Sequence, residues 1–150
     1  MFLDKDIFTQ VIDSTPLVSI DLVIENSAGE VLLGLRNNKP AQGFWFVPGG
    51  RILKNESMDS AFQRLCQQEL GVAASRAEAE FLGPYEHFYT DSVFSDSVST
   101  HYVVLGYKLR LNIELDSLPS SQHNQYCWMT KADILNSNVV HKHSQWYIES

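Results

Sequence analysis

Alternation of apolar and polar residues predicts that much of this chain is β-structure. Such alternation sends successive side chains to opposite faces of a strand, as in a half-buried sheet. Segments with this pattern, or with short β-branched and aromatic runs, are 17–25, 30–36, 44–47, 79–82, 86–89, 100–111 and 126–129. The first two are joined by residues 26–29, whose composition is typical of a turn. The polar segments 37–43, 91–99 and 115–124 are expected to be loops.

Apolar residues at helical spacing predict several helices. The first covers residues 4–14 and ends before Pro16, because proline cannot continue a helix. The second covers residues 57–70, where Ser57 can cap the N-terminus and Gly71 can end the helix in a left-handed conformation. Shorter helices are expected at 131–135 and 141–148. Strands mixed with helices in 150 residues predict an α/β or α+β sandwich.

Composition restricts the class of protein. The chain is 44% hydrophobic and 19% charged, which fits a soluble globular protein with a single domain over residues 1–150. The net charge of −7 argues against a nucleic-acid binder, so a phosphate ligand would need a metal ion or well-placed arginines. Cys66 and Cys127 form neither a disulfide framework nor a metal cluster, and Cys66 is expected to be a buried thiol. No targeting segment or membrane-spanning run is visible, which favours a cytoplasmic protein.

A motif with fixed spacing begins at Gly50. It continues with Glu56, Arg64, Glu69, Gly71 and Val72. This spacing resembles the signature of the Nudix family, G-x5-E-x7-R-E-U-x-E-E-x-G-U, in which U is a bulky apolar residue. Leu65 and Gln68 stand where that consensus has glutamates. The resemblance implies a Nudix fold, in which a mixed β-sheet lies between α-helices, and a metal-dependent enzyme acting on a nucleoside diphosphate linked to another group.

The two departures from the consensus change the expected metal site. Positions 65, 68 and 69 lie on one side of a helix, where three glutamates would bind Mg²⁺ through oxygens. Leu65 cannot bind a metal, Gln68 offers a neutral carbonyl, and Glu69 alone is charged. We therefore expect a single Mg²⁺, with Mn²⁺ able to substitute. The family match makes Glu69 the natural ligand, together with a backbone carbonyl of Gly49 or Gly50.

Longer segments resemble one subgroup of the family, the GDP-mannose mannosyl hydrolases. The shared segments are 14–19, 36–43, 45–51, 61–65, 87–89, 100–106 and 122–123. The subgroup also has leucine after the arginine of the motif and a single glutamate before Leu-Gly, so both departures fit it. The resemblance implies Mg²⁺-dependent hydrolysis of GDP-mannose or GDP-glucose to GDP and the free sugar. It also implies that water attacks the anomeric carbon, with inversion.

Hydrolysis at carbon with a diphosphate leaving group needs fewer catalytic groups than most glycosidases use. A metal ion can neutralise the charge that develops on the diphosphate, so a general acid is unnecessary and one base suffices. A histidine titrates at about 6.5 and suits this role near neutral pH. The resemblance assigns His123 as the general base and Gln122 as a metal ligand. The pattern alone favours a solvated loop histidine at position 123.

Two arginines and an aspartate are candidates for substrate binding. Arg36 and Arg51 can each present a guanidinium fork to the diphosphate, or else form surface ion pairs. Asp21 could accept hydrogen bonds from sugar hydroxyls, or be a solvated carboxylate on an edge strand. Glu56 and Arg64 are expected to pair, and Arg64 could also reach a phosphate.

Aromatic residues extend this set. His87 could donate to the leaving diphosphate, and Tyr89 and Tyr102 could contact phosphate or sugar, with packing as the alternative for each. Tyr102 is preferred over His101 because adjacent strand residues face opposite sides. His141 and His143 are expected to be surface residues. Trp146 and Tyr147 are expected to pack the last helix and not to bind a base.

Two other functions stay open at this point. The chain could be a nucleotide-sugar pyrophosphatase that attacks phosphorus, which Leu65 and Gln68 disfavour. It could also be a non-catalytic domain that senses nucleotide sugars, which Glu69 and the pair Gln122-His123 disfavour. We expect a small-molecule nucleotide sugar as ligand, and neither nucleic acid nor membrane as partner. The resemblance also implies a homodimer in which the helix at 1–15 packs on the partner.

Overall fold

The computed structural model describes residues 3–119 and 123–149, with side chains for all of these except 123 and 124. The helices are α1 (Lys5–Ser14), α2 (Met58–Leu65), α3 (Lys131–Asn136) and α4 (Lys142–Glu149). The strands are β1 (Leu17–Glu25), β2 (Glu30–Arg36), β3 (Trp45–Phe46), β4 (Gly49–Arg51), β5 (Glu80–Tyr89), β6 (Thr100–Arg110) and β7 (His123–Thr130). Short turns are the π-helical η1 (Cys66–Leu70) and the 3₁₀ helices η2 (Arg76–Glu78) and η3 (Leu115–Ser117).

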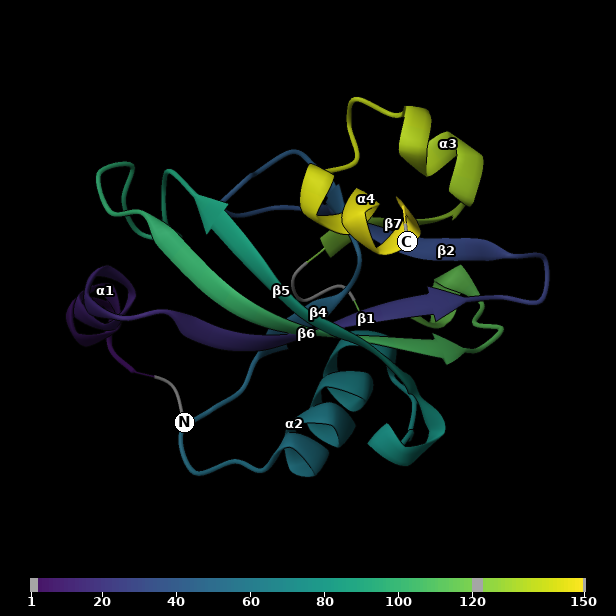
Figure 1. Cartoon of the computed structure of the whole chain (residues 1–150), viewed down its shortest axis with the longest axis horizontal. Coiled ribbons are helices and arrows are strands. Elements are labelled where there is room, and N and C mark those ends of the chain that lie inside the picture. The colour runs from purple at the N-terminus through teal and green to yellow at the C-terminus, as the bar shows by residue number, and fades with distance from the viewer. Residues whose placement is uncertain (1–2, 120–122, 150) are drawn as a thin grey trace.

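The strands form one mixed sheet between two layers of helices. The described strands make a seven-stranded sheet in the order β3-β2-β1-β6-β5, with β4 paired to β1 and β7 paired to β2. Strands β1 and β6 run parallel, whereas the other pairs are antiparallel. Helix α2 covers one face of the sheet, and α3 and α4 cover the other (Figure 1). This arrangement confirms the expected α+β sandwich and its mixed sheet.

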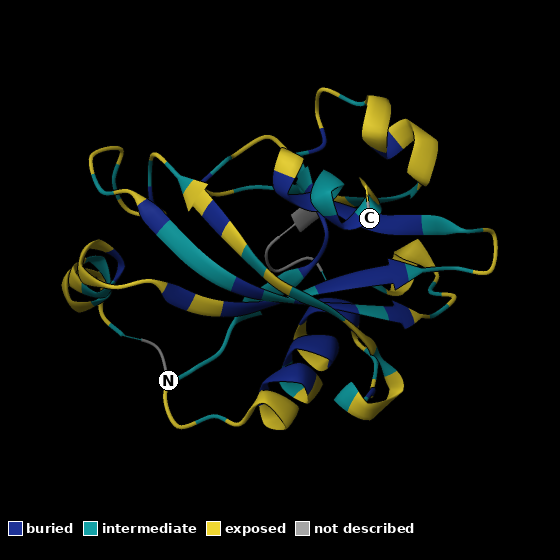
Figure 2. Cartoon of the chain, viewed as in Figure 1, coloured by how far each residue is buried: buried dark blue, intermediate teal, exposed yellow. Residues whose placement is uncertain are grey.

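Strand β1 divides the core between these two faces. Ile20, Leu22 and Ile24 are fully buried in the cluster that contains Phe62 of α2. Val23 belongs to the second cluster, which contains residues of α3 and α4. Both sides of β1 are therefore buried in apolar surroundings (Figure 2), as the period of two in a strand requires. Asp21 lies on the same side as Val23, which gives this carboxylate a buried environment.

Most of the expected elements are present, with four differences. The segment 115–124, which we expected to be a loop, contains the 3₁₀ turn η3, and β7 begins near its end, at His123. The segments 79–82 and 86–89 belong to one strand, β5, because an irregularity beside Gly83 (φ +119°) lets the strand continue past a break in the pattern. The glycine-rich segment 49–51 was not expected to be a strand, but it pairs with β1 as β4. The helix expected at 57–70 changes at Cys66 into the π-helical turn η1, before Gly71 ends it with φ +69°.

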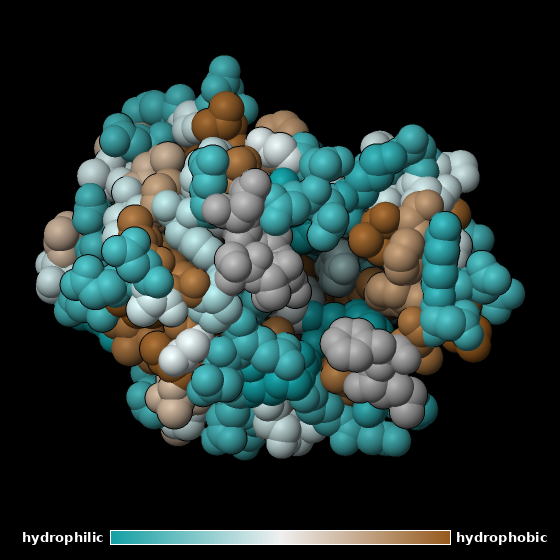
Figure 3. Space-filling view, turned by 180° about the vertical axis from the view of Figure 1, so that it is seen from behind, coloured by the Kyte–Doolittle hydropathy of each residue, from teal (hydrophilic) through white to brown (hydrophobic). Residues whose placement is uncertain are grey.

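Two further features of the molecule are the hydropathy of one face and the length and hydropathy of its helices. Seen from behind, hydrophilic and hydrophobic residues are interspersed over the surface, which is hollowed near its centre (Figure 3). Within the described residues, no helix is both long and apolar enough to cross a bilayer.

Candidate active site

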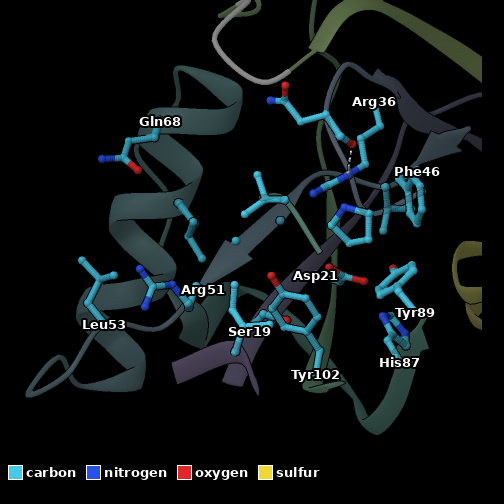
Figure 4. A pocket seen from close by; sticks show the side chains of 18 of the residues that line it. Ser19, Asp21, Arg36, Phe46, Arg51, Leu53, Gln68, His87, Tyr89 and Tyr102 are labelled. Carbon is cyan, nitrogen blue, oxygen red and sulfur yellow. Dashed lines mark hydrogen bonds between the residues drawn. The ribbon is translucent and has the colours of Figure 1, made fainter. Parts of the chain in front are cut away.

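A cavity of about 560 Å³ opens where β4 leaves the sheet beside α2 (Figure 4). Its lining comes from α1, the sheet, the loops after β2 and β5, and α2. The polar lining residues are Ser19, Asp21, Arg36, Asn38, Arg51, Arg64, Gln68, His87, Tyr89 and Tyr102. All seven residues that we predicted to contact the phosphate or sugar line this cavity, and so does Gly49.

Asp21 lies at the centre of the cavity (Figure 4) and is held from one side by α4. The hydroxyl of Tyr147 donates to its Oδ2 at 2.7 Å. Burial raises the pKa of Asp21 to about 7, opposed by the Tyr147 hydrogen bond and the charge of Arg36. Asp21 is therefore an inward carboxylate on a central strand and not a solvated edge residue. Near neutral pH it can accept or release a proton.

Arg36 and Arg51 place two positive charges on different sides of the cavity (Figure 4). The Nε of Arg36 donates to the carbonyl of Asn38 at 3.0 Å, and its guanidinium lies over Phe46 at 5.9 Å. The guanidinium of Arg51 lies over the ring of Phe8, 4.3 Å from its centroid. Two guanidinium groups facing one polar cavity suit a ligand with two phosphates.

Glu56 and Arg64 form the expected ion pair. Arg64 Nε donates to Glu56 Oε2 at 2.7 Å and Nη2 donates to Oε1 at 3.0 Å, which lowers the pKa of Glu56. The same guanidinium donates to the carbonyl of Arg51 at 2.8 Å and to Oε1 of Gln68 at 3.0 Å. Arg64 therefore fastens α2 and η1 to β4. Its contact with a phosphate stays a prediction.

Leu65 packs against Gly50, where the family consensus has a glutamate. The Leu65 side chain is 2% exposed and belongs to the core cluster beneath α2. A Cβ on Gly50 would collide with Cδ2 of Leu65, so the leucine occupies the space that the glycine leaves free. Leucine at this position is a packing residue of the cavity wall and brings no charge to it.

Glu69 is a buried carboxylate of η1, the turn that follows α2, and it is not among the residues that line the cavity. It is 3% exposed, and its Oε1 has no hydrogen-bond partner in the described part of the chain. Burial raises its pKa to about 7, opposed by the charges of Arg36 and Arg64. A buried acceptor without a partner fits an oxygen ligand of a divalent cation. Gly49, which lines the cavity, could add a backbone carbonyl.

The number of metal ions stays a prediction. Within the described residues, no group of three or more His, Cys, Asp or Glu side chains could hold a metal. Mg²⁺ usually keeps several waters and takes few protein ligands, so a single carboxylate with neutral oxygens is sufficient. Gln122 and the side chain of His123 lie outside the described residues. The backbone of His123 pairs with Arg36, which brings it beside a residue of the cavity.

His87 lies in an aromatic stack at the end of the cavity. Its ring is 4% exposed and stacks on His143, with centroids 4.2 Å apart and an interplanar angle of 9°. Burial lowers the pKa of His87 to about 4, so the imidazole is neutral near pH 7. Tyr89 and Tyr102 meet edge to face at 6.4 Å, and both line the cavity. His101 stacks on Phe88 instead, as the alternation predicted.

The expectation that His141 and His143 are surface residues is wrong. His143 is 2% exposed, and half-buried His141 stacks on Phe46 at 4.7 Å. Tyr147 packs α4 as expected, but its bond to Asp21 was missed. The spacing of His143 and Tyr147 could have pointed to this role, because residues four apart share one face of a helix. Phe8 and Ile12 of α1 were also missed as lining residues.

Comparison with known proteins identifies the family. The model of the NUDIX domain matches residues 15–149. The chain belongs to the Nudix family. A relative from Haloferax volcanii, the low-salt glycan biosynthesis protein Agl8, is 42% identical over 123 residues, which are 80% of this chain and 74% of that one. Nudix hydrolases generally use divalent metal ions such as Mg²⁺, which agrees with the unpartnered carboxylate of Glu69.

Solved structures share the fold at lower sequence identity. A MutT protein from Methanosarcina mazei Go1 superimposes with a TM-score of 0.73 at 20% identity, covering 91% of this chain and 93% of that one. A MutT NUDIX hydrolase from Burkholderia pseudomallei gives 0.71 at 23% identity, covering 91% and 98%. At these identities the likeness establishes the Nudix fold and leaves the substrate to the residues of the cavity.

Proposed function

We propose that this Nudix protein hydrolyses GDP-mannose or GDP-glucose to GDP and the free sugar, with Mg²⁺ as the cofactor. The oxygen of water forms a bond to the anomeric carbon, and the bond from that carbon to the diphosphate oxygen breaks. GDP leaves with the electron pair of that bond. The configuration at the anomeric carbon is inverted.

The packing of Leu65 on Gly50 carries this proposal. It fills with hydrocarbon a position at which the Nudix consensus has a metal-binding glutamate, and it leaves Glu69 as the buried carboxylate of the helix. Activation of water for attack on phosphorus is favoured by several carboxylates around clustered ions. One ion instead suits the neutralisation of a leaving group. The wall therefore favours attack at a site away from the metal, on the sugar carbon.

Each residue of the cavity has a role consistent with this reaction. Arg36 and Arg51 bind the diphosphate, with Arg64 as a further contact, and Asp21 accepts hydrogen bonds from sugar hydroxyls. His87, neutral near pH 7, donates its N–H to the leaving diphosphate. Tyr89 and Tyr102 contact the phosphate or the sugar. The assigned metal ligands are Glu69, Gly49 and Gln122. When bound, the metal ion neutralises negative charge on the diphosphate. His123 takes the proton of the attacking water.

Two further observations support a sugar-containing substrate. A relative of this chain is named for glycan biosynthesis, in keeping with a substrate that contains a sugar. The cavity has a carboxylate, three arginines and two tyrosines on its lining, which matches a ligand with both phosphates and hydroxyls. We also propose a homodimer. In the single chain, α1 lines the cavity through Phe8 and Ile12.

Hydrolysis of GDP-mannose in ¹⁸O-water tests the proposal. GDP and labelled free mannose are the expected products, because water oxygen joins carbon. GMP with mannose 1-phosphate, labelled in a phosphate, would instead identify a pyrophosphatase and overturn the proposal. Binding without turnover in the presence of Mg²⁺ would identify a nucleotide-sugar sensor. GDP-glucose, run in parallel, ranks the two hexoses.

A further inference from the structure

Helix α4 contacts three separate segments that line the cavity. Tyr147 donates to Asp21 on β1, and the ring of His143 stacks on His87 of β5. Ser144 accepts a hydrogen bond from the backbone N–H of Val47 at 3.0 Å, just before β4. These contacts come from one face of a helix with no residue among those that line the cavity. The helix therefore lies behind the cavity and touches the residues that face it.

The sheet is built to receive Tyr147. Asp21 pairs with Gly49 on one side and with Gly106 on the other, so neither neighbouring strand position has a side chain. A Cβ on Gly106 would lie 2.8 Å from Cε1 of Tyr147, closer than side chains tolerate. The missing side chain lets the tyrosine ring approach the sheet and bring its hydroxyl to the carboxylate. Tyr85 packs edge to face on the same ring, with centroids 4.6 Å apart, and supports it from β5.

His143 supports His87 in a different way. The rings are nearly parallel, and His143 also meets Tyr89 edge to face at 4.8 Å. Its Nδ1 and the Nε2 of His87 are buried and have no hydrogen-bond partner among the described residues. The contact between the two rings is therefore one of shape and stacking. It holds the His87 ring in the cavity wall and keeps solvent from it.

We propose that α4 is the positioning element of the substrate cavity, in which Tyr147 orients the carboxylate of Asp21 and His143 orients the ring of His87. The inference rests on the proposed function, because it takes Asp21 and His87 as the groups that meet the substrate. Tyr147 and His143 act through these two residues and do not touch the substrate. A helix near the C-terminus thus controls groups on β1 and β5.

Tyr147→Phe tests the first contact, with Tyr85→Phe as the matched control. Both variants lose a hydroxyl from adjoining rings, but only Tyr147 donates to Asp21. We expect kcat/KM for GDP-mannose to fall about 10-fold in Tyr147→Phe and to stay within about 2-fold of wild type in Tyr85→Phe. Crystal structures of the two substrate-free variants give a second readout. The Asp21 carboxylate should leave its wild-type orientation in Tyr147→Phe, which lacks the donor, and keep it in Tyr85→Phe.

His143→Ala and His143→Phe test the second contact. Alanine lets water reach His87, so the pKa of His87 rises from about 4 toward its ordinary value, and kcat/KM falls. Phenylalanine keeps a ring in the stack, so the NMR titration of His87 and the turnover stay close to wild type. Equal behaviour of the two variants at His87, or an unmoved Asp21 carboxylate in the structure of Tyr147→Phe, would overturn the inference.

The orientation of Asp21 and the titration of His87 separate this inference from the proposed function. Both are measured on the protein without substrate, so they remain decisive when GDP-mannose is not hydrolysed. Changes at Asp21 and His87 without turnover would leave α4 as the positioning element of a cavity with another substrate. Turnover with Asp21 and His87 unchanged in the variants would leave the function standing and reject the role of α4. Failure of one variant to fold leaves the other contact to decide, because Tyr147 and His143 address different residues.

Discussion

The cavity has two walls, and the contacts that hold their polar groups differ in how far apart the contacting residues lie along the chain. The motif wall, formed by β4, Glu56, α2 and η1, is fastened by the Glu56–Arg64 pair, whose residues are eight positions apart. The α4 wall, formed by Asp21, His87 and Tyr89 with α4 behind them, depends on the Tyr147–Asp21 bond, whose residues are 126 positions apart. The motif wall is therefore a local unit of the chain, whereas the α4 wall exists only in the complete fold.

The walls also differ in charge. In the motif wall, Arg64 lowers the pKa of Glu56, so the pair is ionised near neutral pH. In the α4 wall, burial raises the pKa of Asp21 to about 7 and lowers that of His87 to about 4. The motif wall therefore holds an ionised pair, although burial raises the pKa of its Glu69 to about 7, as it does for Asp21. The ionised pair on one side and the neutral imidazole of His87 on the other suit the proposed reaction, in which a charged diphosphate leaves a neutral sugar.

The largest expected effect concerns the base, which belongs to neither wall. His123→Gln should lower turnover by about 10²–10⁴-fold, the usual contribution of a general base, because glutamine cannot take a proton from water. His101→Gln is the control, since His101 stacks on Phe88 away from the cavity. Steady-state kinetics at neutral pH measures both. Nearly normal turnover in His123→Gln would return the role of base to a carboxylate of one wall, Asp21 or Glu69.

A smaller effect distinguishes the two walls by their metal dependence. Glu69→Gln should raise the Mg²⁺ concentration for half-maximal activity by about 100-fold, because a charged ligand is lost. Loss of a residue that only supports a ligand lowers metal affinity by about 10- to 100-fold, so loss of the ligand itself should reach the upper end of that range. Glu80→Gln, an exposed carboxylate on β5, is the control. His143→Phe should leave the Mg²⁺ requirement unchanged, since the α4 wall holds no assigned ligand. An equal shift in His143→Phe and Glu69→Gln would abolish the distinction between the walls.

The range of the contacts explains which parts of the fold the sequence predicted. Strands 17–25 and 30–36 were predicted with their observed bounds, because apolar and β-branched residues mark them locally, even where burial on both faces weakens the alternation. Strand β4 was missed because Gly49 and Gly50 have no side chain that could show alternation. The π-helical turn η1 was also missed, because the residues of 57–70 favour a helix of either kind.

The site divides in the same way. The motif spacing predicted the Glu56–Arg64 pair and the importance of Glu69, since these residues lie within one loop and one helix. The resemblance supplied Asp21, Arg36 and His87, but it gave no reason for their orientation. The bond from Tyr147 to Asp21 and the stack of His143 on His87 join distant segments. The spacing of His143 and Tyr147 indicates that they share a helix face, but it does not show which residues that face contacts.

Restoring the consensus at position 65 tests whether the motif wall alone sets the chemistry. Leu65→Glu should lower the free energy of unfolding by about 3 kcal/mol, because it removes a buried leucine and places a carboxylate in the core against Gly50. Leu65→Met, which conserves volume, should cost less than about 1.5 kcal/mol. Urea denaturation measures both, and product analysis follows the bond that is cleaved. Release of GMP by Leu65→Glu would show that this one position selects phosphorus over carbon.

The smallest expected effect is the acid sensitivity of the α4 wall. Burial lowers the pKa of His87 to about 4 and of His143 to about 2, whereas the unfolded chain binds a proton at each near its ordinary value of about 6.5. The unfolded state therefore binds more protons below pH 6.5, and the stability that is present above this pH falls as pH falls toward about 4. His143→Phe removes one of these groups and should reduce the slope of unfolding free energy against pH by up to about 1.4 kcal/mol per pH unit. The buried carboxyls Asp21 and Glu69, whose pKa is raised, give a slope of opposite sign, but both are present in either protein, so the difference isolates His143. Urea denaturation of wild type and His143→Phe between pH 4 and 7 measures it, with His101→Phe as the control. Parallel curves would mean that His143 is protonated in the folded protein, and that the α4 wall is not the neutral counterpart of the motif wall.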